Sequence, residues 1–359
     1  MDTDPILRPK SPSRDGLRNV RGLLEGIAAG AVYGVFLRGF VVIQTALQKP
    51  YSMQNPKVAQ HQVGIMDSWN AGGEVMTFAF LLLGPFLIGL LTVRRMEARH
   101  PFSSWTWIVA PWLAVVCMMV VVALFAWEGA ICVLMALPIT LILSSLGGIA
   151  GGLLSRRRWL SKGNTLSFAL LPFLLAPAES LLPAPVQTRT VSSEIRIHAA
   201  RETVWKNIRQ VSAISPAELR PNWTHRIGFP RPVEATLSHE GVGGVRHATF
   251  EHGLLFVETI TGWEPEHRLA FSIRADTANI PPTTLDEHVT IGGPYFDVLD
   301  GEYRLESLAN GEILLHLVSH QRLSTDFNGY AGLCSDVVMQ SLQTSILQVI
   351  QHRCETRVN

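Results

Sequence analysis

Hydrophobic and polar positions follow two different patterns along the chain. Up to about residue 184, apolar residues form long stretches that contain few charges. Beyond that point, apolar and polar residues alternate with a period of two, or recur at the spacing of an amphipathic helix. The pattern predicts a membrane half, with residues 22–183 as its helical region, followed by a water-soluble half.

Four stretches in the first half are long enough to cross a hydrocarbon core of about 30 Å as helices. These stretches are residues 22–47, 72–93, 104–127 and 131–154. A fifth stretch, residues 165–183, is shorter, contains prolines and carries Glu179 near its end. The sequence therefore predicts a helical bundle with four or five membrane spans.

Basic residues mark one side of the predicted bundle. They gather in an N-terminal tail, residues 1–21, and in the loops at residues 94–99 and 156–162. Because positively charged loops remain in the cytoplasm, we expect the tail and both loops to be cytoplasmic. If the fifth stretch crosses, the soluble half lies outside the cytoplasm, and otherwise it stays inside. Unpaired thiols favour the inside and the span count favours the outside, and we expect an extracytoplasmic domain.

Few ionisable residues interrupt the apolar stretches. Glu25 and Glu179 lie near the ends of stretches, and Arg38 lies inside the first one. Intramembrane charges are functional candidates by default, but the small number and the placement of these favour a structural role. Residues 147–152, "GGIAGG", have the small side chains that allow helices to pack closely. We interpret the membrane half as an anchor or an assembly module.

The second half begins with a linker and then shows the signals of a folded domain. Residues 184–190 have a linker composition, and the domain is predicted to occupy residues 191–359. Residues 192–199 alternate as a half-buried strand, and residues 200–211 have apolar side chains at helical spacing. A loop-rich stretch, residues 212–235, follows.

Strand signals dominate the remainder of the second half, up to a final helix. Turn residues separate strands within residues 244–253, 254–275, 285–291 and 300–324. Asn310-Gly311 is the strongest hairpin signal, and from about Tyr330 apolar residues recur every 3.6 positions. We therefore expect an α+β domain in which a curved antiparallel sheet grips one long C-terminal helix.

This order and several local patterns resemble the START-like helix-grip superfamily, which includes polyketide cyclase/dehydrase and lipid-transport proteins of the SRPBCC type. The most specific piece is "EIRIHAARETVWKNI", supported by "GVGGVRHATF" and "ITGWEPEHRLAFSI". The likeness covers roughly Val191 to the C-terminus, and the fused membrane half resembles that of bacterial membrane-anchored members. It implies a hydrophobic cavity between sheet and helix, and a bacterial inner or plasma membrane. It does not imply catalysis, because one fold hosts many functions.

Candidate ligand-binding residues follow from the expected position of that cavity. On the strand of residues 312–322, His316 and His320 share one face, and the more apolar opposite face includes Leu315 and Leu317. We expect the apolar face to line the cavity and both histidines to point outward. Tyrosine and arginine side chains nearby would orient the polar head of a ligand. The predicted ligand-binding set is Tyr295, Phe296, Tyr303, Leu315, Leu317, Arg322, Tyr330, Leu333 and Val337.

Acidic residues concentrate in residues 283–303, "TTLDEHVTIGGPYFDVLDGEY". The alternation of the strands spreads them over separate turns and strand ends, with Asp300-Gly301 predicted as a turn. His288 in this stretch, and Glu258 on another strand, are candidates for acid–base catalysis, because burial raises the pKa of a carboxyl group. A solvated strand face is the alternative for both. The glycines beside Tyr295 fit a cavity rim or a membrane-facing surface.

Other chemistries find no support in the sequence. No Cys/His spacing fits a metal site, no GxSxG nucleophile elbow is present, and no GK[ST] follows a glycine-rich run. A net charge of +1 argues against a large nucleic-acid footprint. We expect no metal, no cofactor and no nucleic-acid partner.

Three functions remain open. The first is a membrane-anchored domain that binds a hydrophobic ligand such as a lipid, an isoprenoid or a polyketide-like molecule. The second is an enzyme of the cyclase, dehydratase or hydrolase type that uses a cavity carboxylate or histidine. The third is a sensor or assembly module whose cavity is closed by side chains.

Overall fold

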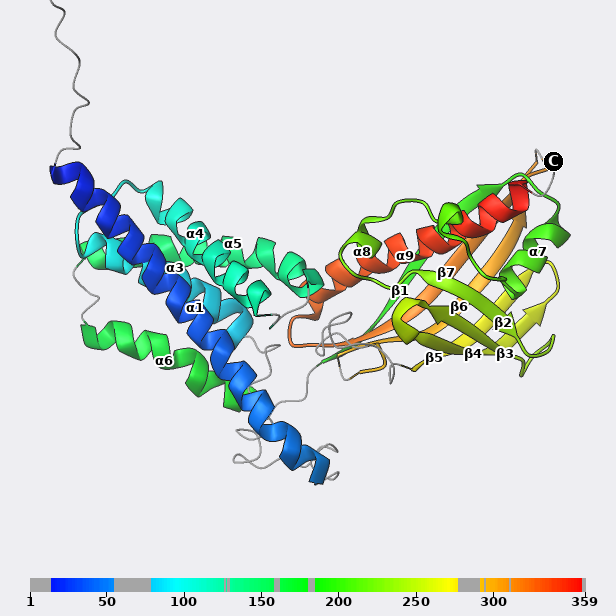
Figure 1. The fold of residues 1–359 in the computed structure, drawn as a ribbon, viewed down its shortest axis with the longest axis horizontal. Helices are drawn as coiled ribbons and strands as arrows, with labels where there is room; N and C mark the ends of the chain where they lie inside the picture. The colour runs from blue at the N-terminus through cyan, green and yellow to red at the C-terminus, as the bar shows by residue number, and fades with distance from the viewer. Residues whose placement is uncertain are drawn as a thin grey trace, which may run out of the picture. The chain divides into compact units, whose positions relative to one another are not determined.

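The computed structural model describes residues 14–54, 79–125, 127, 130–157, 162–179, 185–276, 291–293, 295–309 and 311–356. Internal contacts divide the chain into two compact units, Met1–Trp127 with Ala136–Pro183 and Glu128–Met135 with Ala184–Asn359. We call them the helical unit and the sheet unit, and we describe each by itself (Figure 1). The predicted strand at residues 285–291 lies almost wholly outside the described residues, as does His288.

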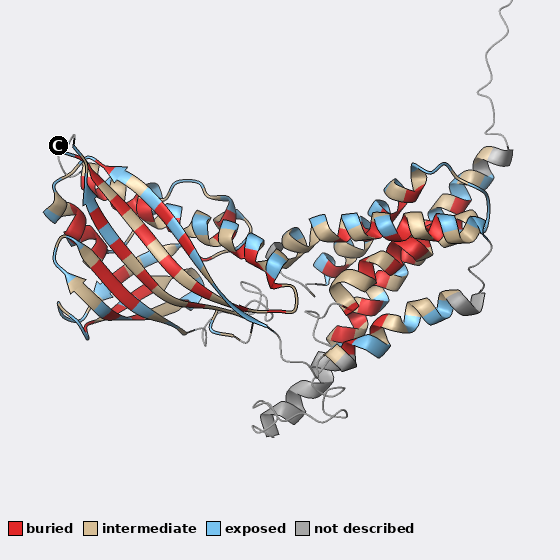
Figure 2. Ribbon diagram, turned by 180° about the vertical axis from the view of Figure 1, so that it is seen from behind, coloured by how far each residue is buried: buried red, intermediate tan, exposed pale blue. Residues whose placement is uncertain are grey.

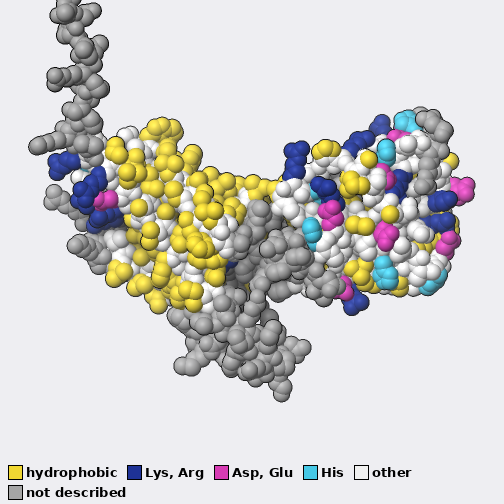
Figure 3. Space-filling model, in the orientation of Figure 1, with side chains coloured by type: hydrophobic (Ala, Val, Ile, Leu, Met, Phe, Trp, Pro, Cys, Tyr) yellow, Lys and Arg dark blue, Asp and Glu magenta, His cyan; other side chains and the backbone are white. Residues whose placement is uncertain are grey.

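The helical unit follows the apolar stretches of the sequence. Its helices are α1 (Arg14–Gln54), η1 (Ala79–Leu83), α3 (Gly84–Glu97), α4 (Thr106–Leu124), α5 (Ala130–Arg156) and α6 (Lys162–Glu179). The first residues of α5, up to Met135, group with the sheet unit. Four segments are long and apolar enough to cross a membrane, and they lie in α1, in η1 with α3, in α4 and in α5. The apolar part of α6, Thr165–Ala176, is shorter. Figure 3 shows apolar side chains covering the visible face of this unit.

Glycines bring the helices of this unit into close contact. A Cβ atom on Gly151 of α5 would lie 2.7 Å from the carbonyl oxygen of Leu90 in α3, and one on Gly147 would overlap the backbone of Phe86. The run at residues 147–152 is therefore a packing face, as the sequence predicts.

One end of the helical unit collects basic side chains around a carboxylate. Glu25 of α1 binds Arg95 at 2.8 Å and Arg99 at 2.9 Å, both from the end of α3 and the loop beyond it. Arg156, at the end of α5, donates a hydrogen bond to the carbonyl oxygen of Phe102 (2.8 Å) and lies over the ring of Trp107. We call this the basic end of the helical unit. The predicted cytoplasmic loops meet there.

The sheet unit is a seven-stranded antiparallel sheet with helices packed on it (Figure 1). The strands are β1 (Val186–Ile197), β2 (Pro232–Leu237), β3 (Val245–Phe250), β4 (Leu255–Glu264), β5 (Arg268–Asp276), β6 (Phe296–Ser307) and β7 (Ile313–Ser324). Their order is β1-β7-β6-β5-β4-β3-β2. The helices are α7 (Arg201–Arg209), the one-turn α8 (Trp223–Arg226) and the long α9 (Asn328–Thr356), with short 3-10 turns η2 (Pro216–Glu218) and η3 (Glu251–Gly253).

This arrangement confirms the predicted helix-grip architecture, in which the sheet holds α9. Buried side chains of α7 and α9, such as Ile208 and Ile350, pack with Leu315 of β7 in one core. Along β7, alternate residues are buried, and the same banding runs across the sheet in Figure 2. The buried set includes Leu315, Leu317 and Ser319, so the prediction that His316 and His320 point away from the core is confirmed.

Three local predictions need correction. β1 begins at Val186, so most of the predicted linker, residues 184–190, is strand paired with β7. The loop-rich stretch contains β2 and α8, which its prolines and short apolar runs concealed. Asp300 and Gly301 lie inside β6 rather than in a turn. Gly301 serves another purpose there, because a Cβ atom would lie 2.7 Å from the ring of Phe271.

Candidate functional site

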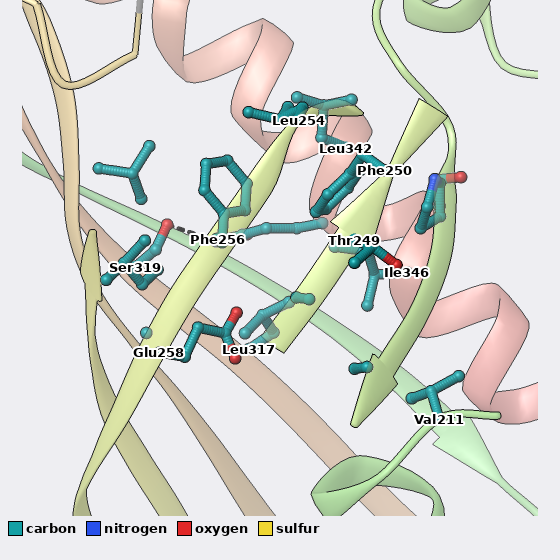
Figure 4. Close-up of a pocket in the computed structure, with 18 of the residues that line it drawn as sticks. Val211, Thr249, Phe250, Leu254, Phe256, Glu258, Leu317, Ser319, Leu342 and Ile346 are labelled. Carbon is teal, nitrogen blue, oxygen red and sulfur yellow. Dashed lines mark hydrogen bonds between the residues drawn. The ribbon is translucent and has the colours of Figure 1, made fainter. Parts of the chain in front are cut away.

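A cavity of about 150 Å³ lies between the sheet and α9. Its wall is formed by residues of β2 to β7, by the segment around α8 and by one face of α9 (Figure 4). Apolar side chains predominate, among them Phe250, Phe256, Leu317, Leu342 and Ile346. The rings of Phe250 and Phe256 meet edge to face with centroids 5.1 Å apart. The sheet supplies this wall because its inward positions alternate with polar outward ones.

Two charged side chains interrupt the apolar wall. Arg246 of β3 and Glu258 of β4 are paired directly across the two strands, and both line the cavity. Arg246 is 4% exposed and Glu258 is 5% exposed. The Nε atom of Arg246 donates a hydrogen bond to Glu258. Its Nη1 atom donates a second one to the carbonyl oxygen of Ile208, at 2.5 Å.

Aromatic rings enclose the guanidinium group of Arg246. It lies 4.7 Å from the ring centroid of Phe271 and 5.6 Å from that of Tyr303. Tyr303, whose hydroxyl group interacts electrostatically with this guanidinium group, lines the cavity as well. A cation held over aromatic faces and bonded to a carboxylate is well compensated inside a protein. We call Arg246, Glu258 and Tyr303 the polar triad.

Burial changes the acidity of all three side chains of the polar triad. It raises the pKa of the Glu258 carboxyl above its ordinary value, and the neighbouring guanidinium of Arg246 opposes this effect only in part. Burial also raises the pKa of the Tyr303 hydroxyl, so that group stays protonated. For Arg246, burial is the largest single influence and disfavours the charge, but Glu258 and Tyr303 together outweigh it and the pKa rises. The triad thus presents a fixed cation, an acid of raised pKa and a neutral phenol.

A second group of polar side chains joins α9 to the cavity wall. Gln343 of α9 donates hydrogen bonds to Ser319 Oγ (2.9 Å) and to the carbonyl oxygen of Val191 (3.2 Å). His225 of α8 lies 3.2 Å from Ser345 Oγ through Nε2. These contacts pair polar groups inside the protein, and they attach α9 to the sheet and α8 to α9.

The structure places the predicted ligand-binding residues in different surroundings. Tyr303 and Leu317 line the cavity, whereas Leu315 is fully buried in the core and away from it. Tyr295 and Phe296 are half-buried at the start of β6 and do not line the cavity. Arg322, half-buried, donates a hydrogen bond to the carbonyl oxygen of Gly293 at 2.7 Å. Tyr330 is a half-buried residue of α9 outside the cavity lining.

The predicted inner face of the C-terminal helix is wrong over its first turns. Leu333 is 64% exposed and Val337 57%, while Gln343 is only 3% exposed. The inner face is polar there, since Ser335 accepts a hydrogen bond from Gln321 of β7 at 3.1 Å. Asp336 binds Arg189 of β1 on the same part of the helix. Hydrogen-bonding partners on the sheet allow these polar residues to be buried, and apolar ones are left outside.

The residues considered for catalysis lie in different parts of the sheet unit or outside the described residues. Glu258 belongs to the polar triad, and it is buried rather than on a solvated strand face. His320 binds Asp300 at 2.6 Å on the outer face of the sheet, so that part of the acidic stretch is not in the cavity. Within the described residues, no group of three or more His, Cys, Asp or Glu side chains could hold a metal ion.

Sequence reasoning missed Arg246, the central residue of the triad. The sequence contains a signal for this residue, because Arg246 and Glu258 are each six residues from His252, at the turn between the two strands. Strands β3 and β4 form a hairpin whose turn ends at Gly253, and their antiparallel pairing places Arg246 opposite Glu258. Opposite charges that face each other across neighbouring strands interact directly. Predicting this pair requires the register of β3 against β4, which the sequence alone does not specify.

Comparisons with known proteins find similarity among solved structures. No family model and no curated protein matches the chain. A START superfamily protein from Mycobacterium smegmatis is 10% identical, over 47% of this chain and 98% of that one, with a TM-score of 0.31. The Zhui aromatase/cyclase from Streptomyces sp. R1128 is 15% identical, over 48% and 97%, with a TM-score of 0.32.

A third similar structure is DynU16, from the dynemicin biosynthetic locus. It is 15% identical, over 47% of this chain and 48% of that one, with a TM-score of 0.29. The chain thus spans about half of the length of DynU16. The strand order and the gripped helix α9 give the sheet unit the helix-grip architecture that the sequence predicts.

Proposed function

We propose that the sheet unit binds a small hydrophobic molecule, or the end of a larger one, in the cavity between the sheet and α9. The observation that carries this proposal is an apolar cavity whose wall contains the buried polar triad. An apolar pocket with a few convergent polar groups is the common design of a ligand site. A lipid, an isoprenoid or a polyketide-like molecule has the matching chemistry.

The polar triad suits recognition of an oxygen atom on the ligand. Tyr303 lies beside Arg246, and a guanidinium group only donates hydrogen bonds, so it leaves the phenol proton of Tyr303 available to an acceptor. A buried ion pair adds little to stability compared with well-packed apolar side chains. The position of this pair in a cavity wall therefore favours a role in binding over a purely structural one.

The size of the cavity restricts the ligand. A cavity of about 150 Å³ is comparable to an engineered one that holds a single benzene molecule. It is about half of the low end of ordinary ligand pockets, near 300 Å³. One ring or a short run of methylene groups fills it, and a longer ligand extends beyond it or requires the wall to move.

The helical unit anchors the domain in this proposal. Four of its segments can span a membrane, and a tethered binding domain meets a membrane-resident ligand at a raised effective concentration. No reaction or transport path through the helices is needed.

The contacts of α6 support a fifth crossing and an extracytoplasmic sheet unit. Tyr33 of α1 donates a hydrogen bond to the carbonyl oxygen of Ala169 at 2.8 Å, and Phe40 of α1 packs against Phe173. Glu179, at the end of α6, accepts a hydrogen bond from the backbone of Ala79. Ala79 begins the segment whose other end is the basic end.

Helix α6 therefore runs beside α1, away from the basic end and toward the opposite end of the helical unit. Its 18 residues span about 27 Å as a helix, close to the thickness of a hydrocarbon core. With the basic end in the cytoplasm, the chain leaves α6 on the other side. In a cysteine-free background, Val242→Cys should react with an impermeant maleimide on intact cells, and Ser103→Cys should not. The reverse pattern would place the sheet unit in the cytoplasm.

Ligand binding is tested by native mass spectrometry of the full chain released from its own membranes. We expect a bound molecule that Tyr303→Phe retains less well, while His316→Ala, on the outer face of β7, retains it as the unaltered protein does. A protein that carries nothing, and that takes up nothing from lipid extracts, would refute the proposal. It would favour the third function, a module with a closed cavity.

A second candidate function is catalysis by Glu258. Its carboxyl group lines the cavity and burial raises its pKa, which suits an acid–base catalyst. If a ligand identified by mass spectrometry is converted to a product, Glu258→Gln should abolish turnover while the ligand still binds. Unchanged turnover would exclude this role for Glu258.

A further inference from the structure

The strand register shows that the cavity lies toward one end of the sheet. Val186, the first residue of β1, pairs with Ser324, and next to it Leu323 pairs with Phe296. The same end of the sheet carries the pairs of Asp276 with Leu255 and of Phe250 with Pro232, because all the strands are antiparallel. We call this the tether end, and the opposite one, where Ile197 pairs with Ile313, the far end.

Residues of the tether end form much of the cavity wall. Pro232, Phe250, Leu254, Phe256 and Val298 lie at or beside the ends of their strands there, and all line the cavity. Toward the far end, side chains of the buried core such as Trp205 and Leu269 fill the space under the sheet. The cavity therefore lies nearer the tether end than the far end.

The tether end is also close in sequence to helix α6. Five residues separate Glu179, the last residue of α6, from Pro185. So short a connection reaches on the order of 20 Å even when it is fully extended. Asn328, the first residue of α9, donates a hydrogen bond to the carbonyl oxygen of Pro185 at 2.5 Å, so the start of α9 belongs to this end.

An apolar stripe runs along the outer face of α9 from that point. Leu333 and Val337 are four residues apart and are 64% and 57% exposed. Ser341 continues the same face, and its carbonyl oxygen accepts a hydrogen bond from Asn222 at 2.9 Å. That contact places the adjacent Trp223, which is 40% exposed, at the end of the stripe. Tryptophan is enriched where proteins meet the interface of a bilayer.

The segment around α8 adds positive charge beside this stripe. Residues 219–233 contain Arg220, Arg226 and Arg231 and no acidic residue. All three side chains are exposed, and the structure records no ion pair for them within the part of the chain it describes. The same segment supplies Phe229 and Pro230 to the cavity wall. Exposed arginines flanking a tryptophan suit a surface of anionic lipids.

We propose that the tether end of the sheet unit rests on an anionic bilayer surface, so that the cavity opens toward the lipid. Leu333, Val337 and Trp223 enter the interface, and the three arginines of the α8 segment bind headgroups. The direct route for a ligand from the bilayer rests on the proposed ligand-binding function, whereas the surface contact itself does not depend on it. A protein partner on the same face is the alternative that the experiment must distinguish.

The test measures the depth of two positions in full-length protein reconstituted in vesicles. The four native cysteines are replaced, and a fluorophore is attached to Leu333→Cys or to Val242→Cys. Val242 is the matched control, since it is 66% exposed and lies in the β2–β3 turn at the far end. Lipids with brominated chains should lower the emission at position 333 about twofold or more, if the stripe is buried in the interface. Emission at position 242 should not change.

Three outcomes would overturn the proposal. Quenching at neither position places the stripe in water, and equal quenching at both means indiscriminate adsorption. Protection of position 333 from aqueous iodide without quenching by brominated lipid means that a protein surface covers it. None of these results bears on ligand retention, because native mass spectrometry measures it after release from the membrane. The membrane-contact proposal and the ligand-binding proposal can therefore be refuted independently.

The arginines are tested in the same vesicles. Replacing Arg220, Arg226 and Arg231 by Gln should abolish the quenching at position 333, and omitting the anionic lipid should have the same effect. The charge-matched control replaces Arg196, Lys206 and Arg304, which are exposed and distant from α8 in the fold, and should leave the quenching intact. Quenching that survives in the first variant would refute the role of the arginines.

Discussion

Arg353 and Arg246 each bind a glutamate in the sheet unit, but the surroundings of the two pairs differ. Arg353 of α9 binds Glu218 of η2 and also donates hydrogen bonds to the carbonyl oxygens of Ser212 and Ala213, both at 2.9 Å. This pair fastens the loop after α7 to the end of α9. The pair of Arg246 and Glu258 instead lines a cavity and is wholly buried.

The two carboxyl groups differ in acidity for the same reason. The hydrogen bond from Arg353 lowers the pKa of Glu218 to about 2, because it outweighs the opposing effect of burial. Burial raises the pKa of Glu258, although its partner is also an arginine. An arginine therefore lowers the pKa of a partly buried carboxyl group, whereas for the more deeply buried Glu258 the cost of desolvation exceeds the effect of the arginine. The pair of Arg353 and Glu218 therefore has a structural role, whereas the pair of Arg246 and Glu258 lines a cavity.

The largest expected effect is the loss of one partner of the buried pair. Arg246→Met leaves an unpaired Glu258 in the cavity wall and should lower the free energy of unfolding by about 3–5 kcal/mol. The matched change Arg353→Met should cost less, about 2–3 kcal/mol, because the Glu218 side chain keeps some access to solvent. Hydrogen exchange at the amides of β3, β4 and η2 in the full chain measures each loss locally.

A double variant keeps this prediction falsifiable. Arg246→Met with Glu258→Leu removes both charges and should recover most of the lost stability, because apolar replacements of a buried pair are tolerated. If the double variant is as unstable as the single one, the pair of Arg246 and Glu258 is essential to the fold. It would then have a structural role, like the pair of Arg353 and Glu218.

The dependence of stability on pH should have opposite signs for the two glutamates. Glu218 has a lowered pKa, so its contribution is complete above its ordinary value of 4.5 and is lost as the pH falls toward about 2. That contribution is about 3 kcal/mol. Glu258 has a raised pKa, so its contribution is complete below 4.5 and declines as the pH rises through the higher folded value.

Glutamine variants isolate the two contributions. Compared with the unaltered protein, Glu218→Gln should weaken the acid-side dependence of stability, and Glu258→Gln should weaken the dependence above pH 4.5. Unfolding of the full chain across this pH range, followed by the same amide exchange, checks both. Curves that change in the same direction would show that burial does not govern the acidity of Glu258.

Removal of one hydroxyl group tests whether the buried pair serves a ligand. Tyr303→Phe keeps the ring against Arg246 but removes the proposed donor, and should weaken ligand binding about tenfold, the equivalent of one hydrogen bond. Unfolding stability should change by less than about 1 kcal/mol. Affinity is measured by titration of the retained ligand against the full chain. Unchanged affinity would mean that the triad does not contact the ligand.

The sequence predicts the fold of this unit better than its site. The alternation along β7 identified Leu317 as inward and His316 as outward, because a strand has only two faces. The same logic failed on α9, where Gln343 is inward and Leu333 outward. A helix face is assigned from the polarity of its residues, and partners on distant strands reverse that assignment here. Arg246 needed the strand register, a long-range property.

The smallest expected effect extends the comparison to an exposed pair of opposite charges. His320 and Asp300 lie 2.6 Å apart on the outer face of the sheet, with side chains 43% and 45% exposed. Solvent screens such a pair, so His320→Ala should change the free energy of unfolding by less than about 0.5 kcal/mol. Ligand retention should not change either, because the cavity lies on the other face. A loss of retention with intact stability would show that the outer face communicates with the cavity, contrary to the separation of the two faces by the sheet.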